Sequence, residues 1–223
     1  MKSLNGRELV GYIKERQAKQ VRSLRGRKIL PKLAIFYDND SPVIAKYMSL
    51  KQKYGDDIGI AVEVQKINSE NAEQLLKAAA GDVATTGIIV QLPLAEVSMN
   101  VLDLIPIEKD VDGLRGMSDT ATAMAIHWLL TGYDIDIKSK KIAIVGHGKL
   151  VGAPLEKMWR ESGYNVTVFD KGDDISKLNE YNLIVTATGV PGLIKSEMVQ
   201  PGAVVVDAGT ASEGGVIKGD LDE

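Results

Sequence analysis

The sequence predicts an α/β protein of two lobes, each built around a mainly parallel β-sheet covered by helices. Strand-like apolar runs alternate with helical patterns along most of the 223 residues, and few hairpin signals separate them. This alternation starts again in the second half of the chain, after a stretch rich in glycine and small polar residues at 113–122. We therefore expect a first lobe over 1–118, a second lobe over 119–223 and a hinge within 113–122.

The first lobe begins with apolar side chains at helical spacing over residues 3–26, which predict a helix ending near Gly26. After it, short apolar runs predict strands, and amphipathic patterns predict helices. The third of these strands ends at Pro93, which has no N–H group to continue a ladder. The strands expected in this lobe are 32–37, 60–66 and 86–93, and the helices expected are 42–57, 69–80 and 96–105.

The second lobe follows the order of elements in a Rossmann-type nucleotide-binding sheet. A helix is expected at 120–132, where Met124 and Trp128 are predicted to lie in the core and His127 to be a packing residue. The strands expected are 141–146, 165–170, 182–189 and 202–209, and a further helix is expected at 151–162.

Composition and charge argue against several classes of function. The net charge of −3 provides no basic field for nucleic acid. The absence of cysteine excludes disulfides and thiolate chemistry, and with only His127 and His147 available we expect no metal site. No apolar stretch approaches the roughly 18 residues of a membrane span, and the N-terminal MKSLNGREL lacks an apolar signal segment. We therefore expect no membrane partner and a cytoplasmic protein.

A glycine-rich turn between a strand and a helix indicates a dinucleotide site. The sequence KIAIVGHGKLVGAPL places Gly146, Gly148 and Gly152 between a Val/Ile strand and an amphipathic helix. Glycines there let the backbone approach a pyrophosphate, which the free N–H groups and dipole of the helix N-terminus attract. Asp170 ends the next strand, 22 residues after Gly148, as the acidic residue does in dinucleotide-binding folds. Three residues at the carboxyl ends of later strands are further candidates for binding the cofactor: Gly189, Gly209 and Thr210.

The charges near this turn bear on the choice between NAD and NADP. The carboxylate of Asp170 can accept hydrogen bonds from both ribose hydroxyls but repels a 2′-phosphate. No arginine lies in the glycine loop, and the cations available are His147, Lys149 and Lys171, the last of which partly offsets Asp170. We expect a preference for NAD, with NADP as the alternative. His147 either contacts a phosphate or only fills a position in the loop.

Three polar features interrupt the apolar pattern of the first lobe. Tyr47 and Lys51 are four residues apart in a predicted helix and therefore share one face. Gln91 stands where a buried strand ends, and the turn KDVDG carries Asp110 and Asp112. Taken singly, these features are typical of a surface pair, a side chain that satisfies loop backbone, and an ordinary turn.

Together with the glycine turn, these motifs resemble the bifunctional methylenetetrahydrofolate dehydrogenase/methenyltetrahydrofolate cyclohydrolase (FolD) family. The order and separation of the motifs follow that family over nearly the whole chain, and VQLPL and KDVDG in tandem are more specific than the glycine loop. The motifs are PKLAIFY at 31–37, YMSLK at 47–51 followed by DIGI at 57–60, GIIVQLPL at 87–94, IPIEKDVDG at 105–113, VGHGKLVGAPL at 145–155, ATGVPGLI at 187–194 and PGAVVVDAG at 201–209.

The resemblance implies a role for each of these side chains. Lys51 would be the central catalytic residue and Gln91 its hydrogen-bond partner, with Tyr47 stacked on the pterin, Asp112 bound to the pterin N–H groups, and Pro93 beside the substrate. The reaction implied is oxidation of 5,10-methylenetetrahydrofolate with NAD(P)+, then hydrolysis of the 5,10-methenyl product to 10-formyltetrahydrofolate. This chemistry belongs to one-carbon metabolism and supplies purine biosynthesis. The family also implies a folate substrate held between the lobes, a cofactor that is usually NADP, and a homodimer.

The sequence departs from the family pattern in four places. Ile44 replaces a small hydroxyl residue, and Gly146-His147-Gly148 replaces the usual Gly-Arg-Ser of the nucleotide loop. The stretch between KDVDG and Thr122 is shorter than usual, which implies a more open cleft wall. The family continues past GDLDE at 219–223 through a Pro-Gly-rich segment and a return helix, so one cleft edge is expected to be missing. These departures keep two alternatives open: a monofunctional enzyme, or a non-catalytic folate- or nucleotide-binding relative.

Overall fold

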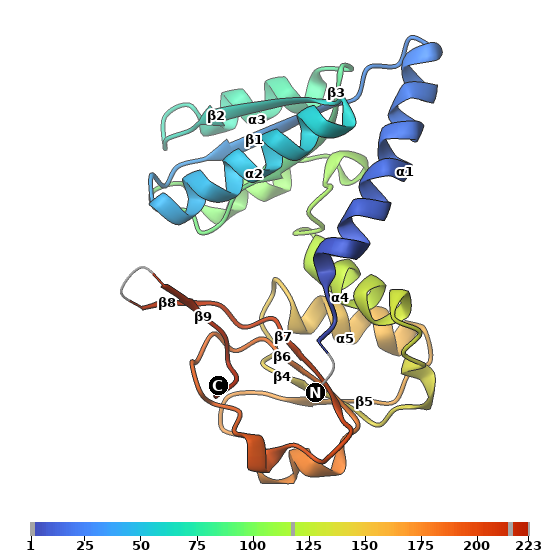
Figure 1. Ribbon diagram of the computed structural model, residues 1–223. Coiled ribbons are helices and arrows are strands. Elements are labelled where there is room, and N and C mark those ends of the chain that lie inside the picture. The colour runs from blue at the N-terminus through green and yellow to red at the C-terminus, as the bar shows by residue number, and fades with distance from the viewer. Residues whose placement is uncertain (1–2, 117–118, 214–215, 223) are drawn as a thin grey trace. The chain divides into compact units, whose positions relative to one another are not determined.

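Two separate parallel sheets organise the chain in the computed structural model, which describes residues 3–116, 119–213 and 216–222 (Figure 1). The first compact unit is Met1–Ser118 and contains a three-stranded sheet. The second is Asp119–Glu223 and contains a four-stranded sheet. The α/β class with parallel sheets is therefore confirmed. The expected hinge at 113–122 includes 117–118, which lie outside the described residues.

The first unit alternates helices and strands in the predicted order. Its sheet has the order β2-β1-β3, and both neighbours of β1 run parallel to it. Its elements are α1 (Gly6–Gly26), β1 (Lys32–Tyr37), α2 (Pro42–Ile58), β2 (Ala61–Lys66), α3 (Ala72–Gly81) and β3 (Thr85–Val90), followed by the 3₁₀ helices η1 (Met99–Leu104) and η2 (Ile107–Lys109).

The core of this unit follows from the alternation of side chains along its strands. Phe36 of β1 and Ile88 of β3 pack with Leu76 of α3 and Leu102 of η1 in one buried cluster. Neighbouring residues such as Ile35, which is fully buried, point to the opposite face of the sheet. Figure 1 shows α2 on one face of this sheet and α3 on the other.

The ends of helix α2 are fixed by its caps, and the spacing of its apolar residues gives it one buried face. The side chain of Ser41 accepts the Ile44 N–H at the start of the helix, and Gly59 ends it with φ of 84°, which glycine adopts without strain. Ile44 and Met48, one turn apart, are both buried. The Ile44 departure from the family pattern is therefore a core residue in this chain.

Two predicted helices of the first unit differ in the structure. The helix expected at 96–105 is wrong in type: only the 3₁₀ helix Met99–Leu104 forms. Ser98 is extended and its side chain accepts the Asn100 N–H, so the helix begins only at Met99. The residues before it, 95–97, lie in a loop whose N–H groups the carboxylate of Asp38 accepts. The helix expected at 69–80 begins later, at Ala72, because the side chain of Asn68 accepts the N–H groups of the two residues before it.

The second unit is a parallel sheet of order β5-β4-β6-β7 with an antiparallel β8-β9 pair beyond it. That pair was not predicted, because its strands have only three residues each. The elements are α4 (Ala121–Gly132), η3 (Ile137–Ser139), β4 (Ile142–Val145), α5 (Gly152–Glu161), β5 (Val166–Phe169), η4 (Ile175–Glu180), β6 (Leu183–Thr186), η5 (Ser196–Met198), β7 (Val204–Asp207), β8 (Ala211–Glu213) and β9 (Val216–Lys218).

The core prediction for Trp128 is wrong, since this side chain is 42% exposed. The buried residues of α4 are Ala123, Ile126 and Leu130, and Trp128 lies off the stripe that they form. His127 is a packing residue as expected, because its Nδ1 lies 3.3 Å from the indole Nε1 of the fully buried Trp159.

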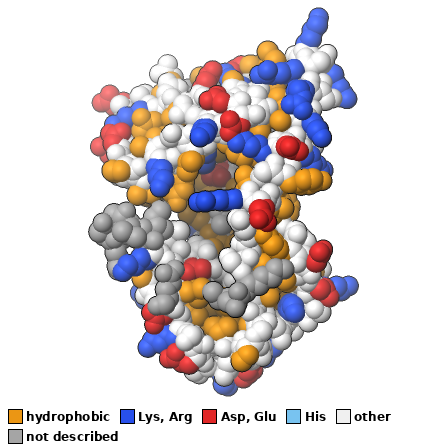
Figure 2. All heavy atoms as spheres, viewed as in Figure 1, with side chains coloured by type: hydrophobic (Ala, Val, Ile, Leu, Met, Phe, Trp, Pro, Cys, Tyr) orange, Lys and Arg blue, Asp and Glu red, His pale blue; other side chains and the backbone are white. Residues whose placement is uncertain are grey.

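The longest helix, α1, is mostly exposed. Its buried stripe is reduced to Val21, and Figure 2 shows Lys and Arg side chains gathered along it. A helix of this composition does not have the apolar length of a membrane span. Across the part of the chain that the structure describes, no helix combines the length and apolar character needed to cross a membrane.

Candidate functional site

Lys51 and Gln91 meet at the carboxyl edge of the first sheet. Lys51 lies one turn after the buried Met48 and is itself half-buried. Its Nζ donates a hydrogen bond to Oε1 of Gln91 at 2.9 Å. The backbone N–H of Gln91 is bonded to the carbonyl of Phe36 at 2.8 Å, which extends the ladder one residue beyond β3. Gln91 also donates its Nε2 to the carbonyl of Leu92 at 3.0 Å, so the amide is held in one orientation.

The KDVDG turn brings Asp112 to the same place. Asp110 forms an isolated bridge with Ile88 of β3, and its buried carboxylate accepts the N–H groups of Gly113 and Arg115 at 3.0 Å each. These bonds close the turn that carries Asp112. Lys51 and Asp112 are near enough to alter each other's ionisation. Residues from a helix, a strand end and a turn are thus gathered at one site.

The environment shifts both charged groups of this site toward their neutral forms. Burial lowers the pKa of Lys51, and the negative charge of Asp112 only partly offsets that effect. Burial likewise raises the pKa of Asp112, against the opposing effect of Lys51 and with a smaller contribution from Asp110. A lowered lysine pKa and a raised carboxyl pKa both move toward neutral pH, which is the direction that acid-base catalysis favours.

Tyr47 and Pro93 flank this group without a described interaction with it. Tyr47 is one helical turn before Lys51, and its side chain is 41% exposed. Pro93 is exposed and follows Leu92 through a cis peptide bond. An exposed ring and an exposed pyrrolidine beside a polar group leave apolar surface available to a flat ligand.

Asp38 is a residue of this region that sequence reasoning missed. It follows β1 directly, is 8% exposed, and accepts the N–H groups of Ala95, Glu96 and Val97 at 2.8 Å each. Burial would raise the pKa of Asp38, but these backbone hydrogen bonds outweigh it and lower the pKa. The bonds anchor the loop that follows Gln91. The signal that could have revealed Asp38 is a carboxylate at the carboxyl end of a buried parallel strand.

In the second unit, two of the three glycines of the loop stand where a side chain would not fit. Gly146 has φ of 95°, and a Cβ atom there would lie 2.6 Å from the carbonyl oxygen of Ala187. A Cβ atom at Gly152 would lie 1.9 Å from the carbonyl oxygen of Gly146, whereas Gly148 has no atom within 4 Å of its Cβ position. The loop is therefore closed by glycine contacts at both ends and open at its centre, beside the N-terminus of the ten-residue helix α5.

Asp170 lies at the same edge as this loop. β4 and β5 are parallel, and the N–H of Gly146 is bonded to the carbonyl of Phe169 at 2.7 Å, so Asp170 follows directly beside the loop. The Asp170 side chain is exposed and accepts the backbone N–H of Lys171 at 2.8 Å. The exposed Asp170 carboxylate therefore stands at the carboxyl edge of the sheet, beside the glycine loop.

His147 is already bonded within the protein. Its Nε2 lies 2.6 Å from Oε2 of Glu156, one turn into α5, and Glu156 also accepts a hydrogen bond from Arg160 at 2.8 Å. Burial would raise the pKa of Glu156, but the bonds from Arg160 and His147 prevail and lower it. Lys149 and Lys171 are the exposed lysines closest in sequence to the loop and to Asp170.

The remaining predicted cofactor residues lie at the same edge of this sheet. Gly189 has φ of 67°, and a Cβ atom there would lie 3.3 Å from the carbonyl oxygen of Thr210, so these two loops touch. Gly209 follows β7 and packs against the buried carboxylate of Asp220. Asp207 and Asp220, which hold these loops by hydrogen bonds, were not found from the sequence. Asp207 lies within the PGAVVVDAG motif, but nothing in the sequence indicates that its carboxylate binds the segment around Asp220.

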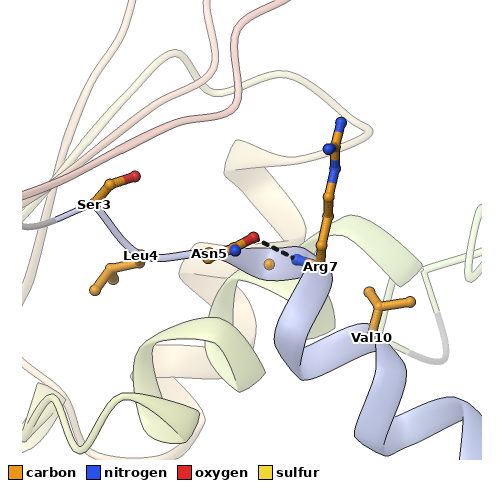
Figure 3. A pocket seen from close by; sticks show the side chains of 6 residues that line it. Ser3, Leu4, Asn5, Arg7 and Val10 are labelled. Atoms are coloured by element: carbon orange, nitrogen blue, oxygen red, sulfur yellow. Dashed lines mark hydrogen bonds between the residues drawn. The ribbon is translucent and has the colours of Figure 1, made fainter.

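One pocket lies away from all of these residues. It is lined by Ser3, Leu4, Asn5, Gly6, Arg7 and Val10 at the N-terminal end of α1 (Figure 3). Figure 3 also shows the Asn5 side chain accepting the Arg7 N–H, which is the N-cap of that helix. The pocket holds no predicted site residue, and its polar groups include a structural cap, so we assign no chemistry to it. Among the described residues, no group of three or more His, Cys, Asp and Glu side chains is placed to hold a metal ion.

Comparison with known protein families assigns both units. Residues 4–112 match the model of the tetrahydrofolate dehydrogenase/cyclohydrolase catalytic domain. Residues 120–223 match the model of the NAD(P)-binding domain of the same family.

Individual relatives match over almost the full chain. The bifunctional protein FolD of Mycoplasmopsis synoviae is 30% identical, covering 100% of this chain and 87% of that protein. The corresponding protein of Staphylococcus carnosus is 32% identical, covering 99% and 85%. The crystal structure of the bifunctional FolD enzyme from Campylobacter jejuni is 31% identical with a TM-score of 0.91, covering 98% of this chain and 85% of that one. This chain belongs to the tetrahydrofolate dehydrogenase/cyclohydrolase family.

Proposed function

We propose that this chain oxidises 5,10-methylenetetrahydrofolate with NAD(P)+ and hydrolyses the 5,10-methenyl product to 10-formyltetrahydrofolate. The observation that carries the proposal is the Lys51–Gln91 hydrogen bond of 2.9 Å, made where the burial-shifted carboxylate of Asp112 acts on the same lysine. A lysine with a lowered pKa, an amide that orients it and a carboxylate for pterin N–H groups are the parts that folate hydrolysis needs.

In the oxidation, this chain's residues bind and align the reactants. The dinucleotide, when bound, supplies the acceptor for the hydride that leaves the methylene carbon. Gly146, Gly148 and the N-terminus of α5 would hold its pyrophosphate, because the loop is open at its centre and bordered by backbone N–H groups. Asp112 would fix the pterin through paired N–H donors, while the exposed ring of Tyr47 would cover its flat face.

In the hydrolysis, Lys51 carries the proton. Water adds to the methenyl carbon, and neutral Lys51 takes the proton that the water loses. The tetrahedral adduct then collapses: its hydroxyl releases a proton to solvent as the formyl C=O bond forms, the bond between that carbon and N5 breaks, and Lys51 gives its proton to N5. Burial lowers the pKa of Lys51 and so increases the fraction of the amine that is neutral. Gln91 accepts a hydrogen bond from Nζ, which keeps the amine directed at the site.

Three finer statements belong to this proposal. We propose that NAD is preferred to NADP, because Asp170 is exposed at the ribose position and His147 is engaged by Glu156. We also propose that the enzyme is cytoplasmic and a homodimer, both by analogy with the family. Light scattering of the purified chain would give twice the 24.1 kDa mass of the chain if the dimer forms, and that mass itself if it does not.

Replacement of Lys51 by Met tests the central step. The variant retains the apolar stem and lacks the amine, so we expect cyclohydrolase turnover to fall by at least about a hundredfold, within the range typical of acid-base catalysis. Lys53→Met is the matched control, since Lys53 lies on the same helix with an exposed side chain. Decay of the methenyl absorbance measures the rate. Turnover of the Lys51→Met variant equal to that of the control would exclude Lys51 from the chemistry.

A further inference from the structure

A buried carboxylate organises the loop that follows β6. Asp220 is fully buried, and its two oxygens accept different backbone N–H groups of that loop. Oδ2 accepts the N–H of Thr188 at 2.7 Å, and Oδ1 accepts the N–H of Val190 at 3.0 Å. Hydrogen bonds to a charged acceptor are stronger than neutral ones, so this loop is held firmly in one conformation.

A second carboxylate holds the first in place. Asp207, the last residue of β7, accepts the N–H groups of Asp220 at 3.1 Å and Leu221 at 3.0 Å. It also accepts the hydroxyl of Thr186 at 3.2 Å and the N–H of Gly209 at 3.0 Å. We call Asp207 and Asp220 the carboxylate clamp. The clamp joins the ends of β6 and β7 to the segment at 219–221.

Two glycines allow the clamp to close. A Cβ atom at Gly209 would lie 2.0 Å from Oδ1 of Asp220. A Cβ atom at Gly219 would lie 2.0 Å from Oδ2 of Asp207. Both distances are far below a van der Waals contact. Each carboxylate therefore occupies the space in which the side chain would lie if residue 209 or 219 were not glycine.

The loop held by the clamp is also a wall of the glycine loop. The Cβ position of Gly146 lies 2.6 Å from the Ala187 carbonyl oxygen and 3.0 Å from Cγ2 of Thr188. On its other side, Gly189 faces the carbonyl oxygen of Thr210. Any shift of the 187–190 loop therefore changes the room available at the nucleotide site. Because Asp220 accepts the N–H groups of Thr188 and Val190, these two donors are engaged within the protein.

We propose that Asp220 is a positioning residue for the dinucleotide: it fixes the 187–190 loop against Gly146, and so sets the shape of the cofactor site without touching the cofactor. This inference rests on the proposed function, because it concerns the same NAD(P) site. It assigns to the segment after β9 a role in binding that neither the glycine motif nor Asp170 accounts for. The cyclohydrolase step, which uses Lys51 and no cofactor, should not depend on Asp220.

The test is Asp220→Asn in the full chain, with Asp222→Asn as the matched control. Asparagine has the same shape but presents an NH₂ group to one of the two N–H donors. We expect the dissociation constant for NADH, measured by calorimetry, to rise about tenfold or more, in line with the loss of charge-assisted hydrogen bonds. We also expect faster amide exchange at Thr188 and Val190, with cyclohydrolase turnover unchanged. Asp222 has an exposed side chain, so its variant should bind NADH normally.

The outcomes separate this inference from the proposed function. NADH binding within twofold of the unmodified chain, in a folded Asp220→Asn variant, would overturn the inference alone. Equal losses of NADH binding and cyclohydrolase turnover would also overturn it, because Asp220 would then be a general structural residue. If Asp220→Asn does not fold, Gly219→Ala displaces Asp207 without a change of charge, and normal NADH binding by that variant would count against the clamp. Failure of the unmodified chain to bind either dinucleotide would instead refute the proposed function.

Discussion

At the scale of single residues, the proposed chemistry depends on how burial and charge set the protonation of Lys51. Burial favours its neutral form, and Asp112 favours its charged form. The two residues are 61 positions apart in the sequence. How closely the turn at 109–113 approaches α2 therefore decides how far burial and the charge of Asp112 shift the pKa of Lys51. The carboxylate that we propose binds the pterin thus also raises the pKa of Lys51, which lowers the fraction of neutral amine at a given pH.

The pH profile of the cyclohydrolase tests this coupling. If neutral Lys51 accepts the proton, the rate rises with pH through the pKa of Lys51. Asp112 raises that pKa, so Asp112→Asn should move the rise in kcat to lower pH, measured at saturating methenyl substrate. The weaker substrate binding of this variant should appear in KM. A profile that stays in place, or moves to higher pH, would show that Asp112 does not act on the lysine.

Cofactor choice also depends on single side chains. We expect the unmodified chain to turn over faster with NAD than with NADP at equal concentrations, because the exposed carboxylate of Asp170 repels a 2′-phosphate. Asp170→Ser should narrow or reverse that ratio, since Lys171 then stands without the opposing charge. Asp173→Ser is a nearby control in the same turn. Strong preference for NADP in the unmodified chain would contradict the charge argument.

At the scale of elements, loops are held by carboxylates that stand directly after parallel strands. Asp38 follows β1 and binds the loop at 95–97, and Asp207 ends β7 and binds the segment at 219–221. Backbone N–H groups in such loops have no strand partner, so a carboxylate satisfies them and fixes the loop at the same time. Both loops lie at the carboxyl edges of their sheets, where ligands bind in open α/β folds.

Asp38→Asn should therefore destabilise the first unit. Three N–H groups lose a charged acceptor, and we expect the free energy of unfolding at pH 7 to fall by about 2 kcal/mol. Asp38 has a lowered pKa in the folded state, so its contribution is complete above its unfolded pKa of 3.8 and is lost as pH falls through the folded pKa.

Urea unfolding at several pH values measures this difference. The gap between the unmodified chain and the variant should be full at neutral pH and should shrink below the unfolded pKa of 3.8. Asp40→Asn is the control, because that exposed residue forms only a surface ion pair with Lys66. Equal losses in the two variants would show that the backbone bonds of Asp38 add nothing to stability.

At the scale of the whole molecule, the chain carries two separate cores under two separate sheets. The candidate catalytic group Lys51, Gln91 and Asp112 belongs to the first unit, and the glycine loop with Asp170 belongs to the second. A ligand that binds one unit should stabilise that unit by mass action, by about 2.7 kcal/mol at a hundred times its dissociation constant.

Hydrogen exchange followed by mass spectrometry would test this division. Saturating NADH should slow exchange most in peptides that cover β4, the glycine loop and the ends of β6 and β7. A folate analogue should slow exchange most around α2, Gln91 and the 109–113 turn. Protection by NADH that is strongest in the first unit would contradict the assignment of the dinucleotide to the second.

The sequence by itself determined the α/β class, the succession of most strands and helices, and the family, because these follow from local periodicity and from motifs of fixed spacing. Its errors came where distant groups compete with local preference. In the 96–105 segment the first residues are held in a loop by the carboxylate of Asp38, nearly 60 residues earlier, and only the 3₁₀ helix Met99–Leu104 follows them.

Only the tertiary structure decided the roles of Asp38, Asp207 and Asp220, whose long-range partners lie 13 to 59 residues away. It also decided that Trp128 is exposed, since the buried stripe of α4 is set by what packs against it. Hydrogen bonds that a carboxylate accepts from distant backbone N–H groups leave no periodic pattern in a sequence. Their existence depends on where the sheets bring chain segments together.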